Sequence, residues 1–217
     1  MRHPLSPTRH PSAILFLVQV VGVLLYPFME QAPHGQIALN IFGVTVLVIT
    51  TRMVRRTPGI TWISACLALA IIVLLALQSL YDLPRLLPWA SALEALFYFY
   101  AAGSLIAYMM EDYRTTTDEL YAAGATFTLL AWGFTHCFVV TQALQPGAFA
   151  DPGSTALRTW SDLNHLSFAL LSSTGMGSVV AQSPHARAIA SLEMMVGVMY
   201  LAGVVTRLIA FTTHTKE

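Results

Sequence analysis

The stretch "LLSSTGMGSVVAQSP", from Leu170 to Pro184, places two glycines one residue apart between apolar segments. A helix interior disfavours this arrangement, because each glycine costs about 1 kcal/mol relative to alanine. Glycine is favoured where the backbone must be left-handed. Gly175 and Gly177 alternate with Thr174 and Met176, and a chain that alternates between right- and left-handed conformations points its successive carbonyl groups one way. The stretch therefore predicts a non-helical backbone that presents a row of carbonyl oxygens.

The overall composition is that of a membrane protein. Of the 217 residues, 56% are hydrophobic and 10% are charged, and the mean hydropathy is +0.64. A soluble domain has about 25% charged residues. The formal net charge is zero, so the charge balance does not indicate a nucleic-acid partner or an acidic substrate.

Six apolar segments are long enough to cross a membrane, which requires about 20 largely apolar residues. Proline, glycine or charged residues separate them. The sequence therefore predicts an all-α integral membrane protein with six transmembrane helices. The predicted spans are roughly residues 12–29, 35–54, 60–81, 89–110, 120–144 and 186–212.

The distribution of Lys and Arg predicts the orientation, because these residues are enriched on the cytoplasmic side. With both termini inside, three of the 11 basic residues, Arg85, Arg158 and Arg187, lie on the outer side. We therefore expect a multi-pass protein of the plasma membrane with cytoplasmic N- and C-termini. Residues 145–185 then lie on the outer side.

Within this outer segment, "LRTWSDLNHLSFALLSS" predicts a short helix, because apolar residues recur at helical spacing. Thr159 or Ser161 is placed to cap its start, with Asp162 in the first turn. A helix of about fourteen residues cannot cross a membrane. Followed by non-helical backbone, it predicts a segment that re-enters the membrane.

Several copies of such a segment around one axis would present stacked rings of carbonyl oxygens. Rings of this kind replace the water shell of a cation. The short helix would also aim its negative C-terminal end at the centre of the pore. These features favour an ion-conducting pore.

Residues 160–207 resemble the pore module of potassium channels, with its pore helix, filter, proline-containing outer turn and inner helix. The family's filter reads Thr-Val-Gly-Tyr-Gly-Asp. The matching run here is Ser173, Thr174, Gly175, Met176, Gly177 and Ser178. The resemblance implies a homotetramer of the bacterial six-helix, one-pore type in a lipid bilayer. It also implies that the carbonyls of the first five of these residues bind a monovalent cation, most simply K⁺.

The same layout implies a division of the chain into two parts. Residues 1–115 would form a four-helix scaffold similar to a voltage sensor, and residues 116–217 the pore domain. Voltage sensors carry several basic residues within the membrane, but the predicted fourth span, residues 89–110, has none. We therefore expect a scaffold without gating charge, and no soluble ligand-binding domain.

Two departures from the family pattern bear on selectivity. Met176 stands where the family has an aromatic brace, and Ser178 stands where it has an aspartate. Methionine is flexible and has no donor, and serine is shorter and neutral. Trp160 and Ser178 remain candidate supports of the filter. A weakly selective Na⁺/K⁺ channel is the alternative function within this class.

Two residues of the predicted sixth span are singled out. Glu193 is ionisable, which indicates a functional site; we expect it to brace the filter from behind, with His136 as one candidate partner. Gly197 lies 20 residues after Gly177, where the family's inner helix bends. It is expected to be a hinge, with close helix packing as the alternative.

Three further titratable side chains are expected outside the pore: Glu94 lies at the membrane interface, and His165 and His185 flank the filter on the outer side as solvated loop residues. A pH-sensitive outer mouth is the alternative role of the two histidines. A secondary transporter is the alternative from a different class, since transporters also contain broken helices. The sequence has one broken segment and no internal repeat, which disfavours it. It also has no HExxH motif, Cys-His cluster or facing carboxylate pair, so we expect no enzyme activity and no cofactor besides the permeant cation.

Overall fold

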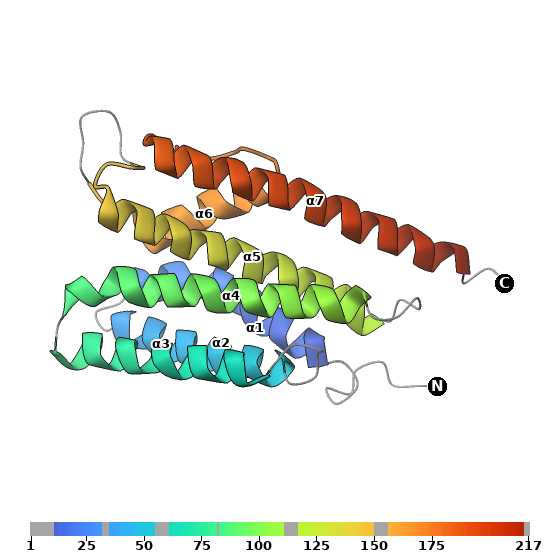
Figure 1. The fold of residues 1–217 in the computed structure, drawn as a ribbon, viewed down its shortest axis with the longest axis horizontal. Helices are drawn as coiled ribbons and strands as arrows, with labels where there is room; N and C mark the ends of the chain where they lie inside the picture. Colours follow the sequence, from blue (N-terminus) through green and yellow to red (C-terminus); the bar gives the residue numbers. More distant parts are fainter. Residues whose placement is uncertain are drawn as a thin grey trace. The chain divides into compact units, whose positions relative to one another are not determined.

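The computed structural model describes residues 11–31, 35–54, 61–81, 83–110, 117–149 and 156–214. Within these ranges the regular structure is entirely helical (Figure 1). A 3₁₀ turn, η1 (Pro84–Leu86), precedes the fourth helix. The α-helices are α1 (Pro11–Gln31), α2 (Gly35–Val54), α3 (Thr61–Tyr81), α4 (Leu87–Met110), α5 (Thr117–Leu144), α6 (Trp160–Leu171) and α7 (Pro184–His214).

Five helices of the described part are long and apolar enough to cross a membrane, which suggests a multi-pass membrane protein. The second predicted span coincides with α2, of which Ile41–Val54 is a shorter apolar helix. Six membrane crossings therefore remain a prediction. The five candidate spans are Pro11–Met29, Trp62–Tyr81, Leu87–Met110, Thr117–Leu144 and Pro184–Val204.

The chain forms two compact units. The first contains Met1–Leu69 and Tyr100–Leu129, and the second contains Ala70–Phe99 and Leu130–Glu217. The borders of the units fall within α3, α4 and α5. The predicted division between residues 115 and 116 lies outside the described residues and stays a prediction.

In the first unit, the carboxylate of Asp118 holds the N-terminus of α1. The backbone N–H of Ser12 donates to Oδ1 of Asp118 at 3.1 Å, and the Ser12 hydroxyl donates to Oδ2 at 2.8 Å. Tyr108 donates to the same Oδ2 at 3.4 Å. A negative charge is favourable at a helix N-terminus, whose first N–H groups lack partners within the helix. Because Ser12 and Asp118 are buried, these bonds join α1 firmly to the start of α5.

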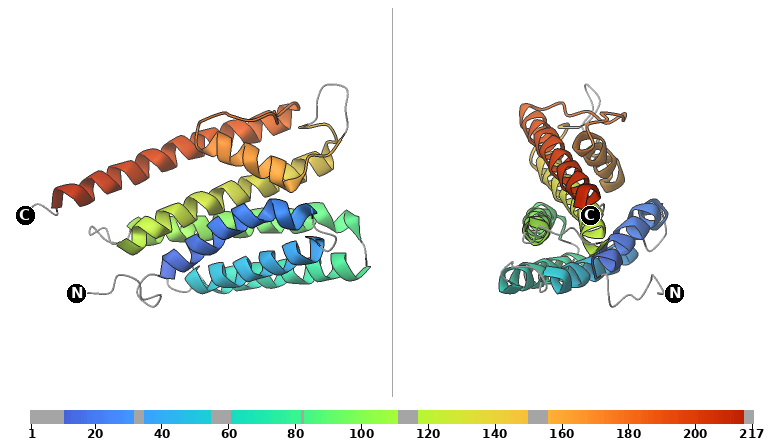
Figure 2. Two further views of the ribbon diagram at one scale, coloured as in Figure 1. Left: turned by 180° about the vertical axis from the view of Figure 1, so that it is seen from behind. Right: turned by 90° about the vertical axis from the view of Figure 1, so that its right-hand side faces the viewer.

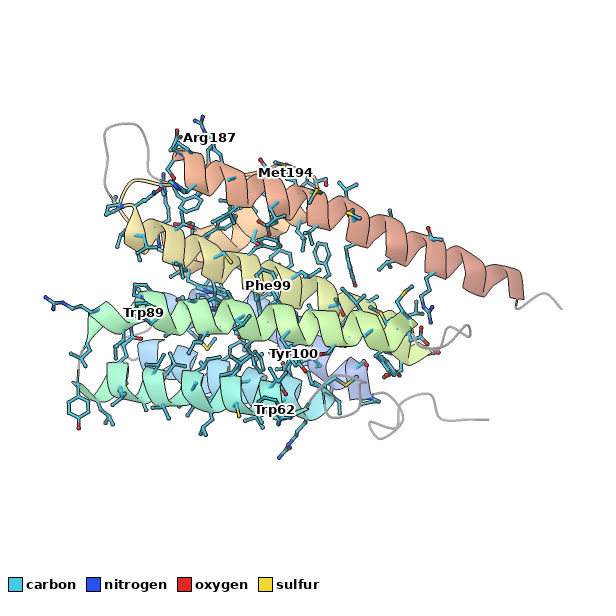
Figure 3. All side chains as sticks on the ribbon, in the orientation of Figure 1. Trp62, Trp89, Phe99, Tyr100, Arg187 and Met194 are labelled. Atoms are coloured by element: carbon cyan, nitrogen blue, oxygen red, sulfur yellow. The ribbon has the colours of Figure 1, made fainter. Side chains whose placement is uncertain are left out.

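In the second unit, α6 lies along α7 (Figures 1 and 2). The Phe99 ring of α4, labelled in Figure 3, meets the Phe134 ring of α5 edge to face, with 4.9 Å between their centroids. Apolar side chains from α5, α6, α7 and the loops between them form the core that positions α6. Its buried members are Phe138, Val139, Ala148, Phe149, Leu163, Leu166, Val179, Ala186 and Ala190.

Replacing Asp118 should therefore destabilise the first unit. In Asp118→Ala the N–H and hydroxyl of Ser12 lose their buried acceptor, and we expect unfolding to become easier by about 1–3 kcal/mol. Thermal unfolding in detergent measures the change. Thr45→Ala is the matched control in the same unit, because that exposed hydroxyl bonds only its own helix at Ile41. Equal stability of the two variants would contradict the assignment.

Candidate functional site

The start of α6 is fixed by a capping box. The Thr159 hydroxyl accepts from the backbone N–H of Asp162 at 3.2 Å, and the Asp162 carboxylate accepts from the backbone N–H of Thr159 at 3.2 Å. This arrangement satisfies two N–H groups that have no partner within the helix. It confirms the predicted start of the short helix and selects Thr159 over Ser161 as the cap.

Trp160, the first residue of α6, contacts aromatic rings of α5. Its ring centroid lies 6.4 Å from that of Trp132 and 6.1 Å from that of His136. His136 also stacks on Tyr98 of α4 at 5.6 Å. Trp160 is the residue of α6 that is farthest from the predicted filter, about 16 Å along the helix axis from the last residue, Leu171. Any support that it gives to the filter acts through α6.

His136 pairs with Glu94 and not with Glu193. Its Nδ1 lies 3.0 Å from Oε2 of Glu94, and the two side chains are only 10% and 14% exposed. No local pattern in the sequence indicates this pair, because it joins residues of two different helices. The Glu94 carboxylate therefore lies in the packing between α4 and α5, and its place at the membrane interface stays a prediction.

The carbonyl end of α6 is capped by the residues that follow it. The backbone N–H groups of Ser173, Thr174 and Gly175 donate to carbonyls of Leu170 and Ala169, each at 3.0 Å. The Thr174 hydroxyl also lies 3.3 Å from the Ala169 carbonyl. These donors are turned back onto α6, so the chain leaves the helix with its N–H groups on one side.

The backbone of residues 173–177, named here the filter segment, alternates as the glycine spacing predicts. The φ angles are +59° at Ser173, +62° at Gly175 and +158° at Gly177. The first two are left-handed, and the third borders on the extended region. Thr174 and Met176 do not have positive φ. The left-handed Ser173 was not anticipated, because serine has a Cβ that disfavours this conformation.

The carbonyl groups of the filter segment are unbonded. Within the described part of the chain, none of them accepts a hydrogen bond, and all five residues are exposed. A row of free carbonyl oxygens on a fixed backbone can replace water around a cation. The described residues also contain no group of three or more His, Cys, Asp or Glu side chains that could hold a metal ion.

An open cavity of about 530 Å³ lies beside the filter segment, between α6 and the start of α7. Met176, 73% exposed, contributes to its wall together with Arg187 and Met194 of α7, both labelled in Figure 3. The side chain of Ser178 is exposed and makes no hydrogen bond with the described residues. The role of Ser178 as a support of the filter stays a prediction.

His165 lies beside the filter segment, as its place before the filter in the sequence predicts. A Cβ atom on Gly177 would lie 3.5 Å from Cδ2 of His165, so the imidazole ring of this α6 residue lies against the end of the segment. Nδ1 of His185, at the start of α7, lies 2.9 Å from Nε2 of Gln145. No spacing rule in the sequence indicates this second contact.

The loop between α5 and α6 is held at its two described ends. The side-chain amide of Gln142 bonds both backbone groups of Arg158, accepting from its N–H and donating to its carbonyl, each at 3.1 Å. Nε of Arg158 donates to the Phe149 carbonyl at 2.9 Å. The end of α5 and the approach to α6 are therefore joined directly.

α7 contacts α6 at two positions one helical turn apart. The Ser167 hydroxyl and the carboxyl group of Glu193 are hydrogen-bonded, and Glu193 is completely buried. A Cβ atom on Gly197 would overlap the carbonyl group of Leu171, the last residue of α6, lying 2.8 Å from its carbon. Glu193 therefore contacts α6 rather than the filter backbone. Close packing accounts for Gly197, and its role as a hinge stays a prediction.

Comparison of the chain with models of known families, with curated proteins and with solved structures gives no match. The described helices themselves define the class: an all-α protein whose long apolar helices suggest several membrane crossings.

Gly197→Ala should separate α7 from the end of α6. The added methyl group meets backbone rather than a flexible side chain, so we expect a loss of about 1–3 kcal/mol of stability. Gly203→Ala is the matched control, because a Cβ atom there has nothing within 4 Å and alanine favours the helix. Thermal unfolding of the two variants in detergent compares them, and a Gly197→Ala protein as stable as Gly203→Ala would disprove the close contact.

Proposed function

We propose that this chain is one subunit of a homotetrameric channel that conducts monovalent cations, K⁺ above all. The carbonyl oxygens of Ser173, Thr174, Gly175, Met176 and Gly177 bind the ion. The chain crosses the plasma membrane six times, with both termini in the cytoplasm. Conduction is passive, so the protein catalyses no reaction.

The observation that carries this proposal is the opposite bonding of the two kinds of backbone group after α6. The N–H groups of residues 173–175 are turned back onto the helix, and the carbonyls of residues 173–177 have no donor among the described residues. Backbone polar groups are tolerated at membrane depth only where protein, water or a ligand satisfies them. A cation stripped of its water shell is such a ligand.

A single filter segment cannot surround an ion, so several copies are needed. Closed cyclic symmetry is the usual arrangement of identical subunits. In one chain, large apolar side chains of α7 remain uncovered, including Val198 at 55% and Met199 at 70% exposure, as does Met176 beside the filter segment. Neighbouring copies and lipid would cover them.

Purified protein in planar bilayers tests the proposal. We expect unitary currents whose reversal potential follows the K⁺ gradient, and we expect Gly175→Val to abolish them. Valine resists the left-handed φ of +62° at this position, and each of the four subunits incurs this conformational strain. Gly203→Val is the control, since its surroundings are open. Slow exchange flux without unitary currents would indicate a secondary transporter instead.

A second candidate function, a weakly selective Na⁺/K⁺ channel, is favoured by one observation. Met176 reaches only the wall of an open cavity, and Ser178 has no hydrogen-bond partner in the described part. A filter segment without these braces has more freedom to change the size of its carbonyl rings. Selectivity by ring size and selectivity by carbonyl field both weaken when the rings move.

The double variant Met176→Tyr with Ser178→Asp should tighten the filter segment. The tyrosine ring has the adjacent cavity to occupy, and each brace adds a hydrogen bond. One net bond contributes about 0.5–1.5 kcal/mol, so we expect the K⁺/Na⁺ permeability ratio to rise about two- to tenfold for each brace that forms. Reversal potentials of both proteins in the same bilayer give the ratio. Complete exclusion of Na⁺ by the unmodified protein would mean that methionine and serine suffice.

A further inference from the structure

The hydroxyl group of Ser167 lies between two oxygen atoms. It is 2.7 Å from the backbone carbonyl of Ala131 on α5 and within hydrogen-bond distance of Oε1 of Glu193 on α7. A serine hydroxyl has one proton to donate and lone pairs that accept. The Ala131 carbonyl can only accept, so the Ser167 proton lies toward it. The contact with Glu193 then requires a proton that comes from Glu193.

A neighbouring pair of side chains allows the same direction. The Thr135 hydroxyl lies 2.8 Å from the Ala131 carbonyl and 3.2 Å from the side-chain amide of Asn164. With the Thr135 proton on the side-chain carbonyl oxygen of Asn164, the Ala131 carbonyl keeps a lone pair for the Ser167 proton. The bond between Ser167 and Glu193 then has a proton only if the carboxyl group of Glu193 supplies it.

The surroundings of Glu193 contain no cation to balance a negative charge. Its exposure is 0%, it makes no ion pair within the described residues, and Oε2 has no hydrogen-bond partner there. The titratable group that faces it from α5 is the thiol of Cys137. His136, next to Cys137, pairs with Glu94. An ionised carboxylate in this position would be buried without compensation, which is costly.

We propose that Glu193 is a neutral, proton-carrying hydrogen-bond donor that fastens α7 to Ser167, and through Ser167 to α5. It is a positioning residue: it contacts no part of the filter segment. One turn further along both helices, Gly197 meets the Leu171 carbonyl, directly before the filter segment. Ionisation of Glu193 would remove the donor and release α7 from α6 next to that point. Any effect of this release on ion conduction rests on the proposed channel function, whereas the protonated state of Glu193 does not.

Infrared spectroscopy of the protein in lipid vesicles tests the protonated state directly. A protonated carboxyl group has a C=O stretching band apart from the carboxylate bands. We expect Glu193→Gln to remove a band of this kind, and Glu94→Gln, which alters the carboxyl group paired with His136, to leave it in place. A spectrum that is unchanged in this region by Glu193→Gln would overturn the proposal, whether or not the protein conducts ions.

Conduction provides the second readout. Glutamine keeps a permanent donor at the same position, so Glu193→Gln should conduct within about twofold of the unmodified protein. Ser167→Ala removes the acceptor, and we expect about a tenfold loss of open-channel current, the effect of one buried hydrogen bond. Ser191→Ala is the control, because that exposed hydroxyl bonds only its own helix at Arg187.

The two arms separate the possible failures. Loss of current in Glu193→Gln while the unmodified protein conducts would mean that a charged Glu193 is required, and would overturn the proposal. If the unmodified protein does not conduct, the channel function fails, and the infrared comparison alone decides the state of Glu193.

Discussion

The bonds that cap the carbonyl end of α6 determine the rest of the candidate site. The last carbonyls of any helix have no N–H donors within the helix. Here the backbone N–H groups of residues 172–175, which follow α6, donate to them. Once these donors are turned inward, the alternation of φ leaves the carbonyls of residues 173–177 without partners. The site is therefore a property of the backbone, and side chains act on it by fixing where α6 lies.

The position of α6 depends on three sets of contacts in the second unit. The aromatic rings of Trp132 and His136 meet its first turn, the Ala131 carbonyl meets its middle through Ser167, and Gly197 meets its last residue. α5 thus contacts the first turn and the middle of α6, and α7 contacts its middle and its last residue. Small and polar residues at two of these points allow the close approach that membrane helices require in the absence of a hydrophobic driving force.

Local chemistry made much of this predictable. The long apolar helices, a cap at Thr159 or Ser161 and the alternation at Gly175 and Gly177 all follow from residues close together in the sequence, because helix length, capping and left-handed φ are local properties. The partners of His136 and Glu193 could not be predicted, since they depend on which faces of distant helices meet. The left-handed Ser173 was missed because the surrounding bonds to α6 override the preference of a residue with a Cβ.

The clamp formed by Gln142 on Arg158 has a practical consequence for handling the protein. The Gln142 side chain bonds both backbone groups of Arg158, and the Arg158 guanidinium donates to the Phe149 carbonyl. These bonds close the loop between α5 and α6 whatever residues the loop contains. The entropy of closing a loop rises only slowly with its length. A peptide epitope grafted between residues 149 and 158 would therefore leave α5 and α6 joined, and would give a handle for purification or labelling.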